Sequence, residues 1–538
     1  NSFCTLLARR RPSATKNKLF SNLSNTGTMW RFLAAAAAGA TTGLGATAVW
    51  LAPAGVKAGE FRPDLPSITL DEVKKHRDPK KSVWVTYKGG VYDVTSFIDA
   101  HPGGRGRILL GAGSSIEPFW RQFKIHDSDE VRKILESHRI GNVAGFDAAA
   151  AAKEEAAQLA AAEKMWDNEP ERHPALQVKS QRPFNAETPA DALTGASEVA
   201  NEVFFVRNHM PVPGEVDLST FCLEVKGENV RQRCHTLDAL REKFTEHTVT
   251  TTLQCGGNRR TDAAKAGPVK GLAWTSGAIG TASWTGFWLR DIIAEAAGSD
   301  GNVDTAEGSH VKFGALDRDA ASSFEVSIPA EMAMSPDRDV LVAYKMNGEP
   351  IPRDHGFPLR AVVPGVVGVR NCKWLKSITL ANEESQSDWQ QRDYKNFPPW
   401  LKTPQPGLDC IYDTPINSQI TEATRDGESV TIKGYAFCGG GRGVQRVEVS
   451  PDGGASFTHG AELSDCDIKQ ARGKRWAWYQ FESTFDLKGD AAKRAEKTDD
   501  PVFEVCTRAV SGTQDVQPAI AAPNFRGLMY NGYSCAKV

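Results

Sequence analysis

The chain has 538 residues, which at roughly 150 residues per domain predicts three or four folded units. Its composition, 40% hydrophobic and 24% charged, is that of an ordinary globular protein, and a formal net charge of -2 argues against a nucleic-acid-binding surface. The ten cysteines include no C-x-x-C pair, which disfavours a zinc ribbon, an iron–sulfur site and a dense disulfide framework.

The N-terminal segment has the composition of a targeting sequence. Residues 1–59 contain no Asp or Glu, and their basic residues are interspersed with Ser, Thr and Leu, as in an organelle transit peptide. An apolar, Ala- and Gly-rich run follows over residues 32–56, long enough to span a bilayer. The pair is similar to a bipartite mitochondrial presequence, which implies the intermembrane space. We expect residues 1–60 to be this presequence; the alternatives are a retained membrane anchor and a disordered tail.

A short hairpin and two histidines mark the first folded unit. Alternating residues predict strands over 83–87 and 91–94, with a turn between them. His101 then precedes Pro-Gly-Gly, and His126 follows 25 residues later. Two neutral imidazoles are a natural axial pair for haem iron, although two histidines alone are weak evidence.

The complete motif is more specific than the histidines. Residues 91–104 read V-Y-D-V-T-S-F-I-D-A-H-P-G-G and resemble the cytochrome b5 family. The resemblance covers residues 64–146. It implies an α+β haem domain that binds haem b, with His101 and His126 as the axial iron ligands.

Residues 147–185 have the composition of a linker. They begin with an Ala/Glu/Lys-rich stretch of strong helix formers that lacks a wide apolar stripe, which favours a solvated helix. Pro170, Pro174 and Pro183 end the helical tendency. We expect a semi-rigid spacer that also works as a tether between two redox domains.

The central domain is predicted over residues 186–403 and contains a distinctive cysteine loop. Cys255 is followed by two glycines, which let the backbone approach a ligand closely, and by Arg259 and Arg260. A positive setting favours the thiolate, the form that binds metals, and soft sulfur ligands suit transition metals. A buried structural cysteine is the alternative from this window alone.

Further polar groups lie in turns rich in proline and glycine. Arg207, Asn208 and His209 end a predicted strand, and His355 and Arg360 lie in an irregular loop. Arginine in such places favours a large anionic ligand.

Together these segments resemble the molybdenum-pterin domain of the sulfite oxidase family. The resemblance implies that Cys255 supplies a thiolate to molybdenum and that Arg207, Tyr394 and Arg526 surround the substrate oxyanion, with Asp393 and Arg260 beside them. It also implies a molybdopterin (Mo-molybdopterin) cofactor that contacts a set of residues in this domain: Phe205, Val206, Arg207, Asn208, His209, Cys255, Asp317, His355, Arg360, Asn371, Cys372 and Lys373. Gly256 departs from the family, which usually has alanine there, and Cys372 is a second thiol that we expect to be structural.

Residues 404–538 contain short alternating runs separated by turn residues, including 430–435, 444–449, 476–481 and 503–510. This spacing predicts an antiparallel β-sandwich of immunoglobulin type. In the family it is the domain that forms a homodimer. The predicted fold class is therefore multidomain α+β with a C-terminal sandwich.

The resemblance implies sulfite as substrate, with electrons passing from molybdenum through haem to cytochrome c. Two alternatives remain. A nitrate reductase-like molybdoenzyme shares these domains but places its haem unit after them and adds a flavin domain, for which 538 residues leave no room. A haem electron carrier with an inactive molybdenum domain is the other; molybdenum content and sulfite turnover distinguish it.

Overall fold

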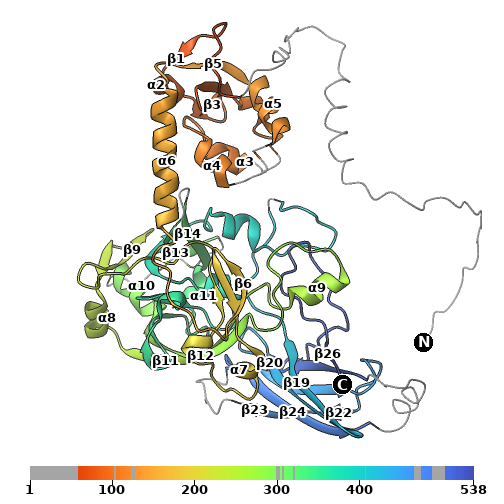
Figure 1. Ribbon diagram of the computed structural model, residues 1–538. Coiled ribbons are helices and arrows are strands. Elements are labelled where there is room, and N and C mark those ends of the chain that lie inside the picture. Colours follow the sequence, from red (N-terminus) through yellow and green to blue (C-terminus); the bar gives the residue numbers. More distant parts are fainter. Residues whose placement is uncertain are drawn as a thin grey trace, which may run out of the picture. The chain divides into compact units, whose positions relative to one another are not determined.

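The computed structural model describes residues 58–101, 105–122, 126, 128–298, 303, 305, 308–318, 322–405, 407–465, 474–487 and 503–538. They form two compact units, one ending at Ala144 and the other made of Ile116–Gln122 and Gly145–Val538 (Figure 1). The predicted presequence falls outside the described residues except for its last three, and so does the whole apolar run over 32–56. Within the described ranges, no helix combines the length and the apolar character needed to cross a membrane.

The first unit is built on a five-stranded sheet. Its strand order is β1-β5-β4-β3-β2, with β1 (Ser67–Ile68), β2 (Arg77–Asp78), β3 (Ser82–Tyr87), β4 (Gly90–Asp93) and β5 (Arg139–Val143). Its helices are α2 (Leu70–Val73), η1 (Thr95–Phe97), α3 (Arg105–Leu109) and α5 (Asp129–Ser137). The predicted hairpin is present as β3 and β4, which pair antiparallel and bury Val83, Val85 and Val91. Lys88 turns the chain between them at φ 49°.

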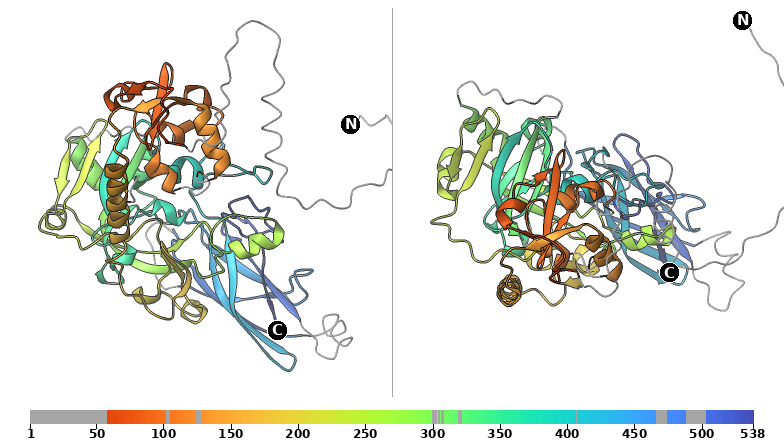
Figure 2. Two further views of the ribbon diagram at one scale, coloured as in Figure 1. Left: turned by 45° about the horizontal axis from the view of Figure 1, so that its top comes forward. Right: turned by 90° about the horizontal axis from the view of Figure 1, so that it is seen from above.

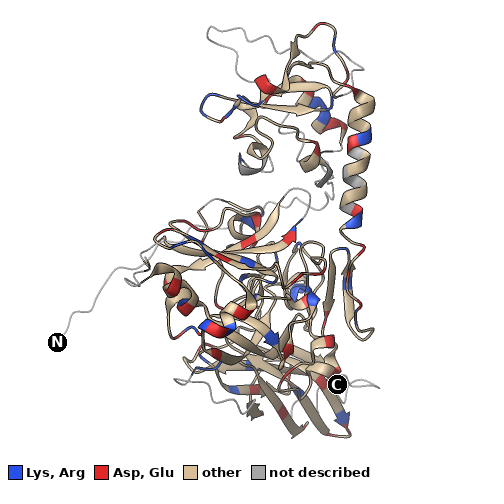
Figure 3. Ribbon diagram, turned by 90° about the vertical axis from the view of Figure 1, so that its left-hand side faces the viewer, with Lys and Arg blue, Asp and Glu red and all other residues tan. Residues whose placement is uncertain are grey.

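Helix α6 (Ala148–Lys164) occupies the predicted linker and runs as one continuous helix (Figure 1). None of its described side chains is buried, as predicted for a solvated helix, and basic and acidic residues both occur along it (Figure 3). The helix ends before the first of the three prolines. The chain then passes into two strands of the second unit, β6 (Gln177–Gln181) and β7 (Phe184–Glu187).

Three sheets form the part of the second unit that precedes residue 404, as far as its residues are described. A small sheet has the order β6-β7-β8, with β8 (Val206–Arg207). The second has the order β10-β9-β18-β13-β14, with β9 (Leu223–Gly227), β10 (Arg233–His235), β13 (His310–Arg318), β14 (Ser323–Pro329) and β18 (Leu375–Ala381). The third has the order β11-β12-β15-β16, with β17 beside β15: β11 (Glu246–Gln254), β12 (Ile279–Trp288), β15 (Leu341–Met346), β16 (Glu349–Pro350) and β17 (Arg360–Val362).

Helices cover these sheets and connect their strands. They are α7 (Ala190–Leu193), η3 (Asn201–Val203), α8 (Leu237–Lys243), α9 (Arg260–Ala266), α10 (Leu289–Ala297), α11 (Ala330–Met334), η4 (Arg353–His355), η5 (Gly368–Arg370) and the π-helix η6 (Trp389–Asp393). The short helix α4 (Glu117–Gln122) is also assigned to this unit. Ile292 and Ile293 of α10 are fully buried in one core with Val225 of β9 and Phe313 of β13. This core fixes the sheets whose ends carry the polar residues described below.

The C-terminal region is the predicted β-sandwich. Two antiparallel four-stranded sheets have the orders β19-β20-β24-β23 and β22-β21-β25-β26 (blue in Figure 2): β19 (Asn417–Asp426), β20 (Ser429–Phe437), β21 (Val444–Ser450), β22 (His459–Gly460), β23 (Glu462–Asp465), β24 (Tyr479–Asp486), β25 (Glu504–Ser511) and β26 (Ser534–Lys537). Their inner faces share one core, which includes Ile432 of β20 and Val447 of β21. The Cys506–Cys535 disulfide links β25 to β26, and Cys222–Cys234 is a second disulfide in the unit.

Candidate active site

The two histidines predicted to bind haem face each other in the first unit. The planes of the His101 and His126 rings differ by 1°, and their centroids are 6.2 Å apart. An imidazole nitrogen lies about 1.1 Å from its ring centre and binds a metal at about 2.0 Å, so two imidazoles on opposite sides of one ion should have centroids about 6 Å apart. The observed spacing therefore leaves room for a single metal ion between the rings.

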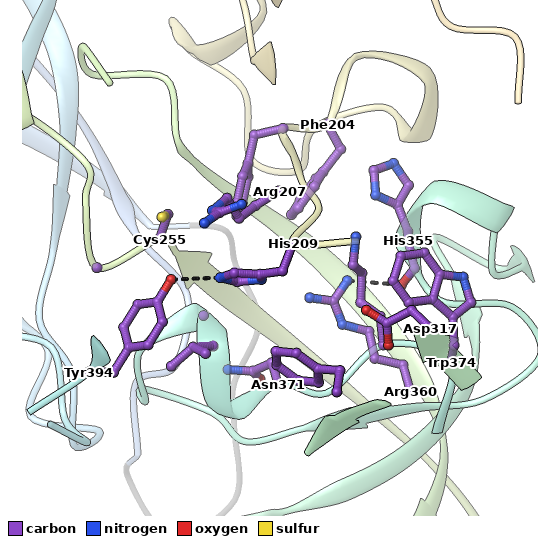
Figure 4. Close-up of a pocket in the computed structure, with 16 residues that line it drawn as sticks. Phe204, Arg207, His209, Cys255, Asp317, His355, Arg360, Asn371, Trp374 and Tyr394 are labelled. Carbon is purple, nitrogen blue, oxygen red and sulfur yellow. Dashed lines mark hydrogen bonds between the residues drawn. The ribbon is translucent and has the colours of Figure 1, made fainter. Parts of the chain in front are cut away.

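A second site is a pocket in the second unit, whose empty space of about 660 Å³ includes open solvent (Figure 4). Residues from the ends of several strands and from the loops after them line it: Phe204, Phe205, Arg207, His209, Cys255, Gly256, Asp317, Phe324, His355, Arg360, Gly368, Val369, Asn371, Lys373, Trp374 and Tyr394.

Cys255 is placed at the pocket by the end of strand β11. Its backbone N–H donates to the Ala278 carbonyl, which continues the β11–β12 pairing, and its sulfur accepts the Gly257 N–H at 3.4 Å. The residue is 6% exposed and forms no disulfide. Gly257 packs against the Arg260 guanidinium so closely that a Cβ atom there would overlap it. The glycine therefore lets the Arg260 guanidinium pack directly against the backbone that follows Cys255.

The pocket has an excess of positive charge. Arg207, Arg360 and Lys373 line it, against the single lining carboxylate of Asp317. Burial lowers the pKa of Arg360 to about 9, and burial lowers the pKa of Lys373 to about 7 although Asp354 opposes this. The Nε–H of Arg360 is buried and has no hydrogen-bond acceptor among the described residues. A buried cation that lacks an acceptor or a counter-charge destabilises the folded protein, which indicates that the pocket is built for an anionic ligand.

Tyr394 and His209 are joined by a hydrogen bond inside the pocket. His209 Nε2 lies 2.9 Å from the Tyr394 hydroxyl (Figure 4). Burial lowers the pKa of His209 well below its ordinary value, and the nearby Arg207 lowers it further, so the ring is neutral near pH 7. Burial raises the pKa of Tyr394, so its hydroxyl keeps its proton. Arg370 Nη2 donates to the Tyr394 carbonyl at 3.2 Å, which fixes the residue directly after the π-helix η6.

The other three predicted catalytic residues lie outside the pocket lining. Arg526 Nη2 is 3.3 Å from Asp393 Oδ2 in an ion pair. Arg260 Nε donates to the Arg526 carbonyl at 2.9 Å, and its Nη1 donates to the Leu272 carbonyl at 2.8 Å. Arg260 thus holds the loop that carries Arg526, and its pKa is lowered by burial.

Three residues expected to contact the cofactor are also absent from the lining. The Val206 side chain is buried in a small core, and the Cys372 thiol points toward the Phe313 carbonyl, with its pKa raised by burial. The Asn208 amide bridges Asp354 and Lys373. The remaining residues of the predicted set do line the pocket. The sequence did not predict six residues that line the pocket. Five of them lie next to or within a few positions of predicted residues: Phe204, Gly256, Gly368, Val369 and Trp374. The sixth, Phe324 on β14, had no signal in the sequence.

Comparison with known proteins covers all three folded regions. Residues 69–144 match the family "Cytochrome b5-like Heme/Steroid binding domain", residues 209–389 match "Oxidoreductase molybdopterin binding domain", and residues 407–538 match "Mo-co oxidoreductase dimerisation domain". The chain is 41% identical to sulfite oxidase of Gallus gallus over 478 residues, covering 87% of this chain and 98% of that protein. The chain belongs to the sulfite oxidase family.

Further matches differ in how much of each protein they cover. Mitochondrial sulfite oxidase of Homo sapiens is 41% identical, covering 86% of this chain and 83% of that protein. Nitrate reductase [NAD(P)H] of Hordeum vulgare is 32% identical, but the match covers only 42% of that protein. The crystal structure of the sulfane dehydrogenase SoxCD from Paracoccus pantotrophus aligns with a TM-score of 0.53 at 25% identity, over 69% of this chain and 88% of that one.

Membership of the sulfite oxidase family gives the chain a molybdopterin site and a b-type haem site, and the residues present fit both groups. The unsatisfied Nε–H of buried Arg360 and the desolvated ammonium of Lys373 suit the anionic phosphate of a pterin cofactor. The buried thiol of Cys255 suits a soft metal. The parallel rings of His101 and His126 suit an axial pair on haem iron.

Proposed function

We propose that this protein is a sulfite oxidase that works in the mitochondrial intermembrane space, with cytochrome c as its electron acceptor. Sulfite and water are converted to sulfate, two protons and two electrons, and two molecules of ferricytochrome c are reduced in turn. The observation that carries the proposal is the convergence of Cys255, Arg207 and the Tyr394–His209 pair on one cationic pocket. A thiolate ligand for molybdenum then lies beside groups that bind an oxyanion.

Bound at this site, the molybdenum cofactor would supply oxygen-atom transfer and accept the electron pair. Cys255 would hold the metal, and Arg360 and Lys373 would bind the cofactor's phosphate. Arg207 lines the pocket, and its Nη1 donates to two neutral oxygens, the Asn185 side-chain oxygen and the Asn208 carbonyl, so its charge is available to a sulfite dianion. A charge-assisted hydrogen bond of this kind is stronger than a neutral one.

The Tyr394–His209 pair would orient the substrate. A neutral histidine carries one N–H, and a His209 ring protonated at Nε2 would donate it to the Tyr394 oxygen. The tyrosine hydroxyl would then be free to donate its own proton to a sulfite oxygen. The Arg526–Asp393 ion pair lies beside this group, and we propose that Arg526 adds a second positive charge at the substrate.

Electrons would leave the pocket one at a time through the haem held by His101 and His126. Residues 64–145 contain 13 basic and 11 acidic residues, so composition gives no support for an acidic face toward a basic cytochrome. Stopped-flow reduction of cytochrome c at several salt concentrations tests this step, because electrostatic docking weakens as salt screens the charges. The C-terminal β-sandwich would form the homodimer, as the description of its family indicates.

An anaerobic optical titration tests the catalytic proposal. Sulfite should reduce the b-type haem of the purified protein, whereas nitrite or buffer should not. Cys255→Ser should abolish the reduction by sulfite but leave the haem bound and reducible by dithionite. If sulfite fails to reduce the haem in a sample that contains a full complement of molybdenum, the proposed substrate is wrong.

A further inference from the structure

The segment that joins helix α6 to the catalytic unit is hydrogen-bonded to the support of the molybdopterin pocket. Arg172 donates two hydrogen bonds to Asp354, from Nε to Oδ2 at 2.8 Å and from Nη2 to Oδ1 at 3.0 Å. The two side chains are only 13% and 9% exposed. A bidentate arginine–carboxylate pair of this kind fixes both groups in one orientation.

Neighbouring contacts hold Arg172 in place. Its guanidinium lies 3.9 Å from the centre of the Phe184 ring and pairs with Glu169, whose other oxygen accepts the Val212 N–H at 2.9 Å. Arg353 Nη2 donates to the Asn168 carbonyl at 2.6 Å. The segment from 168 to 172 is therefore fixed to the catalytic unit, immediately after the turn that ends α6.

Asp354 passes this constraint to the pocket. Its Oδ1 accepts a hydrogen bond from the Asn208 amide at 3.2 Å, and its carbonyl accepts one from Lys373 Nζ at 2.8 Å. Lys373 Nζ also donates to the Asn208 side-chain oxygen. Burial alone would raise the pKa of Asp354, but the hydrogen bond and charge of Arg172 hold it below its ordinary value. Asp354 thus stays ionised: its carboxylate holds Arg172 and Asn208, and its backbone carbonyl holds the Lys373 ammonium at the pocket.

We propose that Arg172 is a positioning residue for the molybdopterin site, which fixes Asp354 so that Asp354 in turn holds Asn208 and Lys373 in the geometry that binds the cofactor's anionic group. The inference rests on the proposed contact between Lys373 and the cofactor. It gives the linker a role in retaining the cofactor as well as in joining the two redox units.

The test measures how much pterin and molybdenum each variant retains during gel filtration of the full-length protein. Arg172→Gln and Asp354→Asn should each speed cofactor loss, by roughly the 10–100-fold typical of residues that orient a ligand-binding group. Arg172→Lys keeps the charge without the bidentate geometry and should be intermediate. Arg182→Gln is the matched control, because Arg182 lies in the same linker, residues 147–185, but forms an exposed pair with Glu163.

A double variant separates positioning from general destabilisation. If Arg172 acts through Asp354, adding Arg172→Gln to Asp354→Asn should cause no further cofactor loss, because interacting residues are not additive. Multiplied losses would overturn the inference. The inference would also be overturned if Arg172→Gln retained the cofactor as well as the wild type but was cleaved faster by protease near residue 168. That result would show that Arg172 only attaches the linker to the catalytic unit.

Lys373→Met tests the premise by the same measurement. It should lose cofactor at least as fast as Arg172→Gln; full retention would overturn both the contact and the inference built on it. Reduction of haem by sulfite in the Arg182→Gln control tests the proposed activity independently. Failure of that activity while cofactor retention follows the expected order would count against the substrate and not against Arg172.

Discussion

Arg360 should have opposite effects on the stability of the protein with and without its cofactor. Its guanidinium is buried, and burial lowers its pKa from the ordinary 12.5 to about 9. One pKa unit corresponds to about 1.4 kcal/mol, so burying the charged group costs folding of the order of 5 kcal/mol at neutral pH. In the cofactor-bound protein, a phosphate would offset this cost.

Arg360→Met should therefore stabilise the cofactor-free protein. The change removes the buried charge but also the hydrogen bond from Nη1 to the His355 carbonyl and the contact with the Trp284 ring. The net gain should be about 1–3 kcal/mol, in the range seen when buried charges are replaced by apolar residues. In the folded protein the guanidinium is charged below about pH 9, so the cost of burying its charge is present in full there. Above about pH 9 the folded protein loses the proton first, and the cost shrinks as the pH rises toward 12.5.

The assay is thermal unfolding of protein produced in a host that cannot make molybdopterin. The variant should melt a few degrees higher, at about 2–4 °C per kcal/mol, and the gain should diminish above about pH 9. Produced in a competent host, the same variant should lack pterin and molybdenum. Lys345→Met, on the strand to which β17 pairs, is the control and should keep the cofactor. A lower melting temperature together with normal cofactor content would refute the reasoning.

Three further changes test the two sites. His126→Ala should abolish the haem absorption, because one axial ligand is lost. His76→Ala is the control and should keep the absorption, because the His76 ring bonds to a nearby serine in the same unit. Haem retained in His126→Ala would contradict axial pairing. Tyr394→Phe removes the hydroxyl that is hydrogen-bonded to His209, so kcat/KM for sulfite should fall roughly 10–100-fold in a steady-state assay. An unchanged value would show that the hydroxyl does not contact the substrate. Binding of molybdopterin to the cofactor-free protein should weaken as the pH rises above about 7, because neutral Lys373 must regain a proton to pair with an anion. Anaerobic reconstitution at about pH 6.5 and about pH 8.5 measures this, and Lys373→Met should remove the pH dependence; equal binding at both pH values by the wild type would rule out such coupling.

Local sequence patterns were sufficient wherever neighbouring residues decide the structure. Alternating apolar residues predicted the β3–β4 hairpin and four strands of the C-terminal sandwich, β20, β21, β24 and β25, because strand side chains alternate between two faces. Strong helix formers without an apolar stripe predicted α6. The family motifs added the identity of the cofactors, since haem and molybdopterin domains carry distinctive runs of residues.

Only the tertiary structure decided which polar groups meet. Arg172 and Asp354 are separated by 182 positions in the chain, and Arg260 and the Arg526 carbonyl by 266, so no local pattern links them. Phe324 reaches the pocket because β14 pairs with β13, a long-range pairing that no motif encodes. The sequence by itself determined the chemistry of each segment through short-range periodicity and motif. The partners of each charge depend on how distant strands pack, because burial and hydrogen bonding arise only when the whole chain has folded.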